Sequence, residues 1–103
     1  MISQIRTYTI NRGMMDQWVD LFNEKLVSIM NQYGISVDAA WVNEDKTLFV
    51  WIRSYADAED IPVKEAAFYG SPEWNSIVDH ARSHIARIQV ETVNSVLNTP
   101  ASK

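Results

Sequence analysis

The stretch TLFVWIRSY, residues 47–55, carries apolar side chains at both alternating sets of positions. Successive side chains of a β-strand point to opposite faces of its sheet. One face therefore receives Leu48, Val50 and Ile52, and the other receives Phe49, Trp51 and Tyr55, with Arg53 among them. A sheet that helices cover on one face only is normally polar on the other. The stretch instead predicts a strand in a sheet with two apolar faces.

The segments before this strand predict two more. Residues 35–42, ISVDAAWV, are joined to residues 47–55 by the polar turn 43–46, which predicts an antiparallel hairpin. Residues 2–10, ISQIRTYTI, alternate in character and are rich in β-branched and aromatic types, which is typical of a partly buried strand.

A first helix is predicted between the first two strands. Apolar side chains recur there at three- and four-residue steps, the spacing of one helical face. They are Met15, Trp18, Phe22, Leu26, Ile29 and Tyr33. Gly34 follows, and a glycine can adopt the left-handed conformation that ends a helix.

The segment after residue 55 predicts a helical arm in two parts. Pro62 fits the first turn of the first part, which Gly70 ends. Ser71 then caps the second part, with Pro72 at its first helical position and Glu73 near the positive end of the helix dipole. The apolar stripe of this second part, which places Trp74 on the buried side, consists of Trp74, Ile77, Val78, Ala81 and Ile85.

A last β-rich segment, HIARIQVETVNSVL, predicts a fourth strand that ends near Val93 or Leu97. Two right-handed βαβ crossovers around a hairpin give an α+β, ferredoxin-like βαββαβ fold, with a four-stranded antiparallel sheet and the helices on one face. Neither an internal repeat nor a low-complexity linker divides the chain. We expect one domain over residues 1–97 and a frayed tail over residues 98–103.

Composition narrows the range of partners. The chain has 9 Lys and Arg against 13 Asp and Glu, a formal net charge of -4, so it lacks a basic surface for nucleic acid. It has no cysteine, which excludes disulfides and thiolate chemistry. No stretch approaches the ~20 apolar residues of a membrane span, and the acidic polar face of the first helix argues against binding to anionic membranes. A cytoplasmic location is expected.

The second apolar face of the predicted sheet requires a cover. An exposed apolar patch of about 300–600 Å² is already as large as a monomer normally shows. The simplest cover is a second copy of the chain, packed sheet against sheet around a two-fold axis. We therefore expect a homodimer through this face. The alternative is that the aromatic side chains pack under a tail or against the edges of the helices.

The sequence resembles the NIPSNAP family of the dimeric α/β-barrel superfamily over nearly the whole chain. The similar segments are IRTYTINRG, MMDQWVDLFNEKL, FVWIRSYADAED, EAAFYGSPEW and the closing strand, and the most specific pieces are RTYTI, Trp51 with Tyr55, and SPEW. The resemblance implies a barrel-forming dimer with a cleft between helices and sheet. Relatives in the superfamily bind small organic molecules there or carry out cofactor-independent oxidations. The resemblance implies no defined reaction, because the family has no uniform activity.

One segment departs from the family pattern. In DAEDIPVKEA, residues 57–66, Pro62 interrupts what is a continuous helix in family members, and the arginine that they carry there has no clear counterpart.

His80 and His84, the only histidines, lie one predicted helical turn apart, and Glu73 falls on the same stripe. A catalytic interpretation makes one of them a general base, because imidazole titrates near neutrality. A metal interpretation uses both imidazoles and the carboxylate, but HARSH matches no known metal signature. We favour a solvated helix edge, and we expect neither a metal nor a cofactor.

Tyr8, Trp51, Arg53 and Trp74 are the candidate ligand-binding residues. Aromatic walls with one guanidinium suit an apolar, weakly acidic or carbonyl-bearing molecule. The competing interpretation, that these residues form core or dimer interface, is the commoner outcome at such spacing.

The remaining charged residues and motifs indicate no further site. Arg6 and Arg87 are interpreted as surface residues that pair with Glu91 and Asp79. No phosphate-binding glycine loop, nucleophile elbow or catalytic triad signature occurs.

Three functions follow from the sequence. The first is a homodimer of NIPSNAP type that binds a small, largely apolar molecule in a helix–sheet cleft. The second is a noncatalytic dimerisation or protein-interaction module. The third is a cofactor-independent monooxygenase or isomerase that uses His80 or His84 with Trp74. A cavity of about 300 Å³ or more lined by Tyr8, Trp51 or Trp74 would favour the first over the second.

Overall fold

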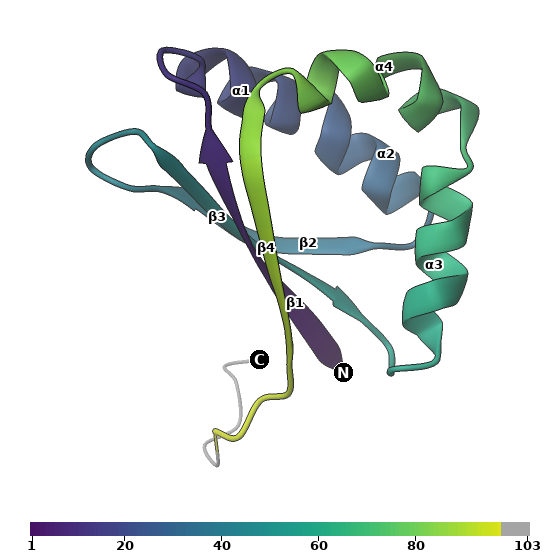
Figure 1. Cartoon of the computed structure of the whole chain (residues 1–103). Helices are drawn as coiled ribbons and strands as arrows, with labels where there is room; N and C mark the ends of the chain where they lie inside the picture. The colour runs from purple at the N-terminus through teal and green to yellow at the C-terminus, as the bar shows by residue number, and fades with distance from the viewer. Residues whose placement is uncertain (98–103) are drawn as a thin grey trace.

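The computed structural model describes residues 1–97 and shows a four-stranded antiparallel sheet with the helices packed against one of its faces (Figure 1). The strand order β2-β3-β1-β4 confirms the predicted ferredoxin-like fold. The predicted tail, residues 98–103, lies outside the described residues. The elements are β1 (Ile2–Ile10), α1 (Met15–Leu21), η1 (Phe22–Leu26), α2 (Val27–Gln32), β2 (Ser36–Val42), β3 (Leu48–Tyr55), α3 (Asp60–Tyr69), α4 (Pro72–Arg82) and β4 (Ile85–Val93).

Strand β1 lies inside the sheet, with one face under the helices. Burial alternates along it, and the buried set is Ile2, Gln4, Arg6, Tyr8 and Ile10. Antiparallel pairing places Arg6 opposite Trp51 and Tyr8 opposite Phe49, so the buried sets of β1 and β3 share one face. This face holds aromatic side chains together with the guanidinium groups of Arg6 and Arg53.

The other face of the sheet carries the second apolar set. Ile5 of β1 pairs with Ile52 of β3, and Val50 of β3 pairs with Trp41 of β2. Ile5, Val50 and Ile52 are half-buried, and Trp41 is 54% exposed. The predicted apolar character of both faces is therefore present in the folded chain.

The first helix contains a wide turn in its middle, where η1 is a π-helix between α1 and α2. Its buried side chains follow one another at steps of four residues: Trp18, Phe22, Leu26 and Met30. In a regular α-helix, side chains four residues apart point in directions that differ by about 40°. The π-helical turn holds more residues per turn, so it reduces this difference and keeps the four side chains closer to one face. As a result Met30 is buried, whereas Ile29, which the three- and four-residue pattern selected, is half-buried.

The corner between α3 and α4 forms as predicted. The Ser71 hydroxyl accepts a hydrogen bond from the Trp74 backbone N–H (3.1 Å), and Pro72 is the first residue of α4. Gly70 has a right-handed φ of -89°, but a Cβ at this position would lie 2.9 Å from the carbonyl oxygen of Ala66. The corner therefore requires glycine for its lack of a side chain.

The predicted place of Pro62 in a first helical turn is confirmed, because α3 begins at Asp60. The expected interruption of the helix is wrong, since a missing N–H in the first turn breaks no intrahelical hydrogen bond. The predicted end of the next helix is also wrong. Helix α4 ends at Arg82, so Ile85 begins β4 and is not part of the helical stripe.

Within residues 1–97 no helix is long and apolar enough to cross a lipid bilayer.

Replacing Trp51 by alanine tests the importance of the aromatic core. Trp51 is 2% exposed, and its ring centroid lies 5.0 Å from that of Phe22. Because the substitution leaves a cavity in place of a large side chain, we expect it to lower the free energy of unfolding by about 3 kcal/mol, measured by urea denaturation. Val63→Ala, at an exposed position of α3, is the control and should change it by less than about 0.5 kcal/mol. Equal losses in the two variants would contradict the prediction.

Candidate ligand-binding cavity

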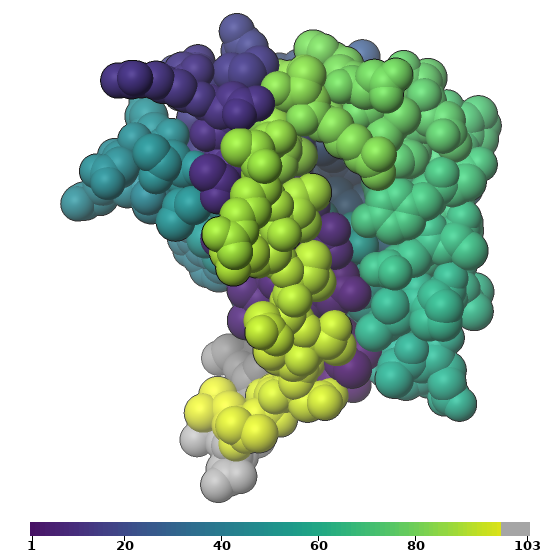
Figure 2. Space-filling view, in the orientation of Figure 1, coloured from purple at the N-terminus to yellow at the C-terminus, as the bar shows by residue number. Residues whose placement is uncertain are grey.

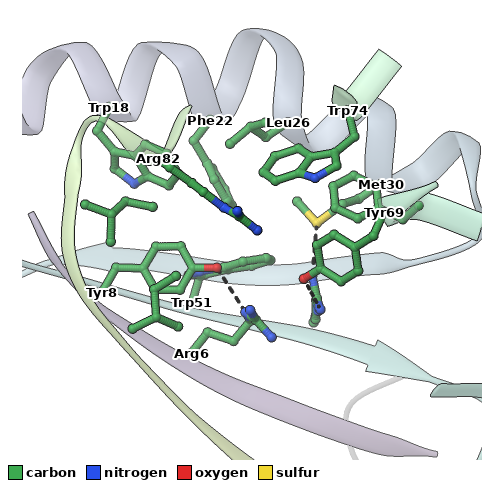
Figure 3. A pocket seen from close by; sticks show the side chains of 14 residues that line it. Arg6, Tyr8, Trp18, Phe22, Leu26, Met30, Trp51, Tyr69, Trp74 and Arg82 are labelled. Atoms are coloured by element: carbon green, nitrogen blue, oxygen red, sulfur yellow. Dashed lines mark hydrogen bonds between the residues drawn. The ribbon is translucent and has the colours of Figure 1, made fainter. Parts of the chain in front are cut away.

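A cavity of about 130 Å³ lies between the helices and the sheet. Figure 2 shows the molecule hollowed between β4 and the arm formed by α3 and α4, on the side where the cavity opens. Side chains from both layers surround the cavity (Figure 3). The lining comprises Arg6, Tyr8, Trp51 and Arg53 from the sheet centre, Trp18, Phe22, Leu26 and Met30 from the first helix, Phe68, Tyr69, Trp74 and Arg82 from the helical arm, and Ile85 and Ile88 from β4.

The walls of the cavity are mainly aromatic. The ring centroids of Trp18 and Tyr8 are 5.8 Å apart, and those of Trp74 and Phe68 are 5.1 Å apart. Tilted and edge-to-face contacts of this kind fix the rings against one another. The shape of the cavity is therefore set by the packing of the core.

Arg53 is fully engaged by the protein. Its Nη2 donates to Oε2 of Glu65 (2.9 Å) and to the Tyr69 hydroxyl (3.1 Å), and its Nε donates to Oε1 of Gln4 (3.1 Å). The side chain is 1% exposed, and the Glu65 carboxylate balances its charge. Arg53 therefore forms part of the cavity floor as one half of a largely buried ion pair.

Arg6 lies beside this ion pair without a carboxylate of its own. Its Nε donates to the Tyr8 hydroxyl (3.0 Å), and its Nη1 donates to Oε1 of Gln4 (2.9 Å), the same oxygen that accepts from Arg53. Within residues 1–97 no carboxylate oxygen lies within 4.0 Å of its guanidinium nitrogens. Arg6 is only 7% exposed, and the rings of Tyr8 and Trp51, at 5.7 and 5.6 Å, offset part of the cost of burying its charge.

Arg82 brings a third guanidinium group to the cavity from the end of α4. It is exposed, and Figure 3 shows it reaching between the first helix and Tyr8 toward the interior of the cavity. It also has no ion-pair partner in the described part of the chain. The cavity lining thus contains three guanidinium groups and no carboxylate.

Hydrogen-bond donors outnumber acceptors around the cavity. Trp18 and Trp51 line it, and the indole N–H of each is buried without a partner among the described residues. The hydroxyl oxygens of Tyr8 and Tyr69 already accept hydrogen bonds from Arg6 and Arg53. A molecule that supplies acceptor atoms would complement this lining better than one that supplies donors.

Tyr55 and Tyr8, which lie near these arginines, resist ionisation. Burial raises the pKa of Tyr55 to about 12 against the opposing effect of Arg53, and the Glu65 carboxylate, which accepts a hydrogen bond from the Tyr55 hydroxyl (3.2 Å), acts in the same direction as burial. Burial also raises the pKa of Tyr8, although the Arg6 charge opposes it. Both phenols are therefore neutral at physiological pH.

The four residues predicted to bind a ligand, Tyr8, Trp51, Arg53 and Trp74, all line this one cavity. Arg53, the cation chosen from the sequence, is already paired with Glu65, and sequence reasoning missed Arg6 and Arg82. Arg6 could have been found from the alternation of β1, because it lies two residues before Tyr8 and so shares its face.

The predicted surface pairing of Arg6 with Glu91 is wrong. Arg6 lies opposite Val90 of β4 on the helix-covered face, whereas Glu91 pairs with Ile5 and belongs to the other face. Arg87 forms no ion pair with Asp79 in the described part of the chain.

His80 and His84 are not among the residues that line the cavity. His84 is 1% exposed and packs against Trp18, with ring centroids 6.0 Å apart, so the predicted solvated helix edge is wrong for this residue. Its Nδ1 lies 2.9 Å from the His80 carbonyl oxygen, which is a helix-capping contact at the end of α4. His80 is exposed, as predicted.

Glu73 lies at the opposite end of α4 from the histidines. It accepts hydrogen bonds from the Tyr33 hydroxyl (2.6 Å) and the Gln32 amide (3.2 Å), and chiefly the first of these lowers the pKa of its carboxyl group. Nowhere in residues 1–97 do three His, Asp or Glu side chains gather as potential metal ligands. The predicted cluster of Glu73 with both histidines is therefore not formed.

The chain matches the sequence profile of the NIPSNAP family over residues 3–100. No curated protein matches it in sequence.

Several solved structures share the fold. An uncharacterised NIPSNAP domain protein from Burkholderia xenovorans gives a TM-score of 0.87 at 17% identity, over 97% of this chain and 99% of that one. A NIPSNAP family protein of unknown function from Agrobacterium tumefaciens gives a TM-score of 0.88 at 18% identity, over 99% of this chain and 94% of that one. SnoaB, a cofactor-independent oxygenase from Streptomyces nogalater, gives 0.72 at 11% identity, over 96% of each chain. At these identities the similarity shows a common fold.

The raised tyrosine pKa values predict a loss of stability in alkaline solution. Tyr55 ionises at the ordinary pKa of 10.0 when unfolded and at about 12 when folded, so its contribution is complete below pH 10 and is lost as the pH rises toward 12. Tyr8 acts in the same direction. We expect the urea midpoint to be constant from about pH 7 to 9 and to fall above pH 10. Tyr55→Phe should reduce this fall, and an unchanged pH profile in that variant would exclude Tyr55 as a cause.

Proposed function

The chain belongs to the NIPSNAP family, and we propose that it acts as a homodimer that binds a small, largely apolar molecule in the cavity between its helices and its sheet. The observation that carries the proposal is the cavity itself. Aromatic side chains from β1, β3, the first helix and the helical arm surround it, and none of them fills it. Ligand sites in proteins are commonly concave, mainly apolar and equipped with a few polar groups.

The size of the cavity limits its occupant. At about 130 Å³ it falls short of the roughly 300 Å³ that would favour ligand binding over an interaction module on size alone. An apolar cavity of about 150 Å³ in another protein binds benzene. The occupant proposed here therefore has about one aromatic ring inside the cavity, and any further atoms lie toward the opening.

The π-helical segment supports a functional use of the cavity. Phe22 and Leu26, the first and last residues of η1, both line it. Single π-helical turns inside α-helices are rare and occur often at functional sites, because they reposition side chains that a regular helix would point elsewhere.

The homodimer is proposed from the uncovered face of the sheet. Ile5, Val50, Ile52 and Trp41 lie on that face, opposite the helices, and Trp41 in particular is largely exposed in the single chain. Packing two such faces together around a two-fold axis would remove these side chains from water.

Two other functions have less support. A noncatalytic interaction module would explain the uncovered face but gives the cavity no role. A cofactor-independent monooxygenase or isomerase draws on SnoaB, with which the chain shares the fold. His80 and His84, which would serve as its base, lie outside the cavity lining.

Blocking the opening of the cavity tests ligand binding. Toluene, benzyl alcohol and benzoate, each with one aromatic ring, serve as probes in thermal unfolding experiments. A molecule that binds the folded chain raises its melting temperature. We expect at least one probe to do so for the native chain. Ile88→Trp should abolish the effect, because Ile88 lines the opening on β4.

Val63→Trp is the control, since Val63 is exposed on α3 and does not line the cavity. It should keep the rise in melting temperature. If none of the probes stabilises the native chain, the binding proposal fails.

The assembly is tested by sedimentation velocity at micromolar concentration. We expect twice the mass of one chain. Trp41→Lys places a charge on the uncovered face and should shift the chain toward the monomer. Val63→Lys, at an exposed position of α3 away from this face, should leave the dimer intact. A native chain that sediments as a monomer would refute the proposed dimer.

A further inference from the structure

We infer that the molecule bound in the cavity is a carboxylate on an apolar body of about one ring, and that Arg6 binds its carboxylate group. This inference rests on the proposed function and adds the chemical class of the ligand and the residue that selects it.

The first argument is the balance of charge beneath the helices. Arg6 and Arg53 are both buried, and both donate to the same oxygen of Gln4. One carboxylate, that of Glu65, lies next to them, and it pairs with Arg53. Burying a charge without a counter-ion is unfavourable, and neutral hydrogen-bond partners and ring faces offset only part of the cost. Arg6 is therefore short of one negative charge.

The second argument is geometric. The described residues occupy Nε and Nη1 of Arg6 and provide no hydrogen-bond partner for Nη2. The two N–H groups of Nη2 can donate to a carboxylate, and such charge-assisted bonds are stronger than neutral ones. Arg6 lines the cavity, so Nη2 is the group through which it would bind a carboxylate there.

The third argument is the character of the rest of the lining. Arg82 adds a second unpaired guanidinium group within the described residues, and Figure 3 shows it on the opposite side of the cavity from Arg6. The indole N–H groups of Trp18 and Trp51 also lack acceptors there. An anion placed among these groups meets donors and positive charge without meeting a carboxylate.

The aromatic walls define the remainder of the ligand. Trp18, Phe22 and Trp74 surround the space next to the guanidinium groups and offer ring faces and edges to an apolar body. A phosphate or sulfate ion would satisfy the charge but would leave this apolar surface without a partner. A planar aromatic carboxylate complements both parts of the cavity.

Isothermal titration calorimetry with benzoate, benzamide and toluene tests the inference on the native chain. The three probes have similar size, but benzoate alone carries a charge. Because a hydrogen-bonded charge contributes more than its neutral counterpart, we expect benzoate to bind about 10- to 100-fold more tightly than benzamide. If benzamide or toluene binds as tightly as benzoate, the inference is wrong while the proposed cavity site stands. If none of the three binds, both fail.

Arg6→Met identifies the residue responsible, since it removes the charge and keeps most of the apolar stem. We expect it to lose the preference for benzoate while still binding toluene, which a general collapse of the cavity would not allow. Arg87→Met is the matched control, because Arg87 pairs with Thr9 on the other face of the sheet, and it should keep the native preference. A retained preference in Arg6→Met would overturn the assignment. Should Arg6→Met fail to fold, the comparison of probes on the native chain still decides whether the ligand is an anion.

Discussion

Two arginines are buried beneath the helices beside a single carboxylate, and only one of them, Arg53, pairs with it. Gln4 bridges the groups, because its amide oxygen accepts from both Arg6 and Arg53 and its amide nitrogen donates to Glu65. Glu65 balances Arg53, whereas Arg6 contacts neutral oxygens and aromatic rings. An apolar side chain packed directly on Arg6 would remove its remaining hydration at high cost. Arg6 is one of the residues that line the cavity, so its uncompensated charge faces the space that a ligand would occupy.

The fold and part of the cavity wall could be predicted from the sequence, because both depend on local periodicity. Alternation in β1 and β3 placed Tyr8 and Trp51 on a common face, and the Ser71–Pro72 cap set the start of α4 and with it the position of Trp74. The features that the sequence did not predict, the π-helical turn and the burial of His84, depend on contacts between distant segments of the chain. The π-helical turn that buries Met30 is not encoded in a regular pattern. His84 is buried because the chain turns back against Trp18 after α4 ends, and helix periodicity alone cannot show this.

The distinction between Arg6 and Arg53 also required the three-dimensional structure. Both follow the inward alternation of their strands, and residue type gives no reason to prefer either. Their roles separate only because α3 brings Glu65 to Arg53. Proteins that share this fold include family members of unknown function and a cofactor-independent oxygenase. The shared fold therefore does not decide function, and any function of this chain must be inferred from the side chains around its cavity.

Both edges of the sheet carry irregular pairing and charged side chains that oppose the addition of another strand. In β2 the pairing with β3 is irregular between Val37 and Ala39, which leaves the acidic Asp38 at a bulge. A bulge with a charged side chain disrupts the regular row of backbone groups that lateral pairing needs. At the opposite edge β4 (Ile85–Val93) pairs irregularly with β1 next to Ile10 and carries the charged residues Arg87 and Glu91. Both borders of the sheet therefore oppose domain swapping and fibril growth from partly unfolded chains.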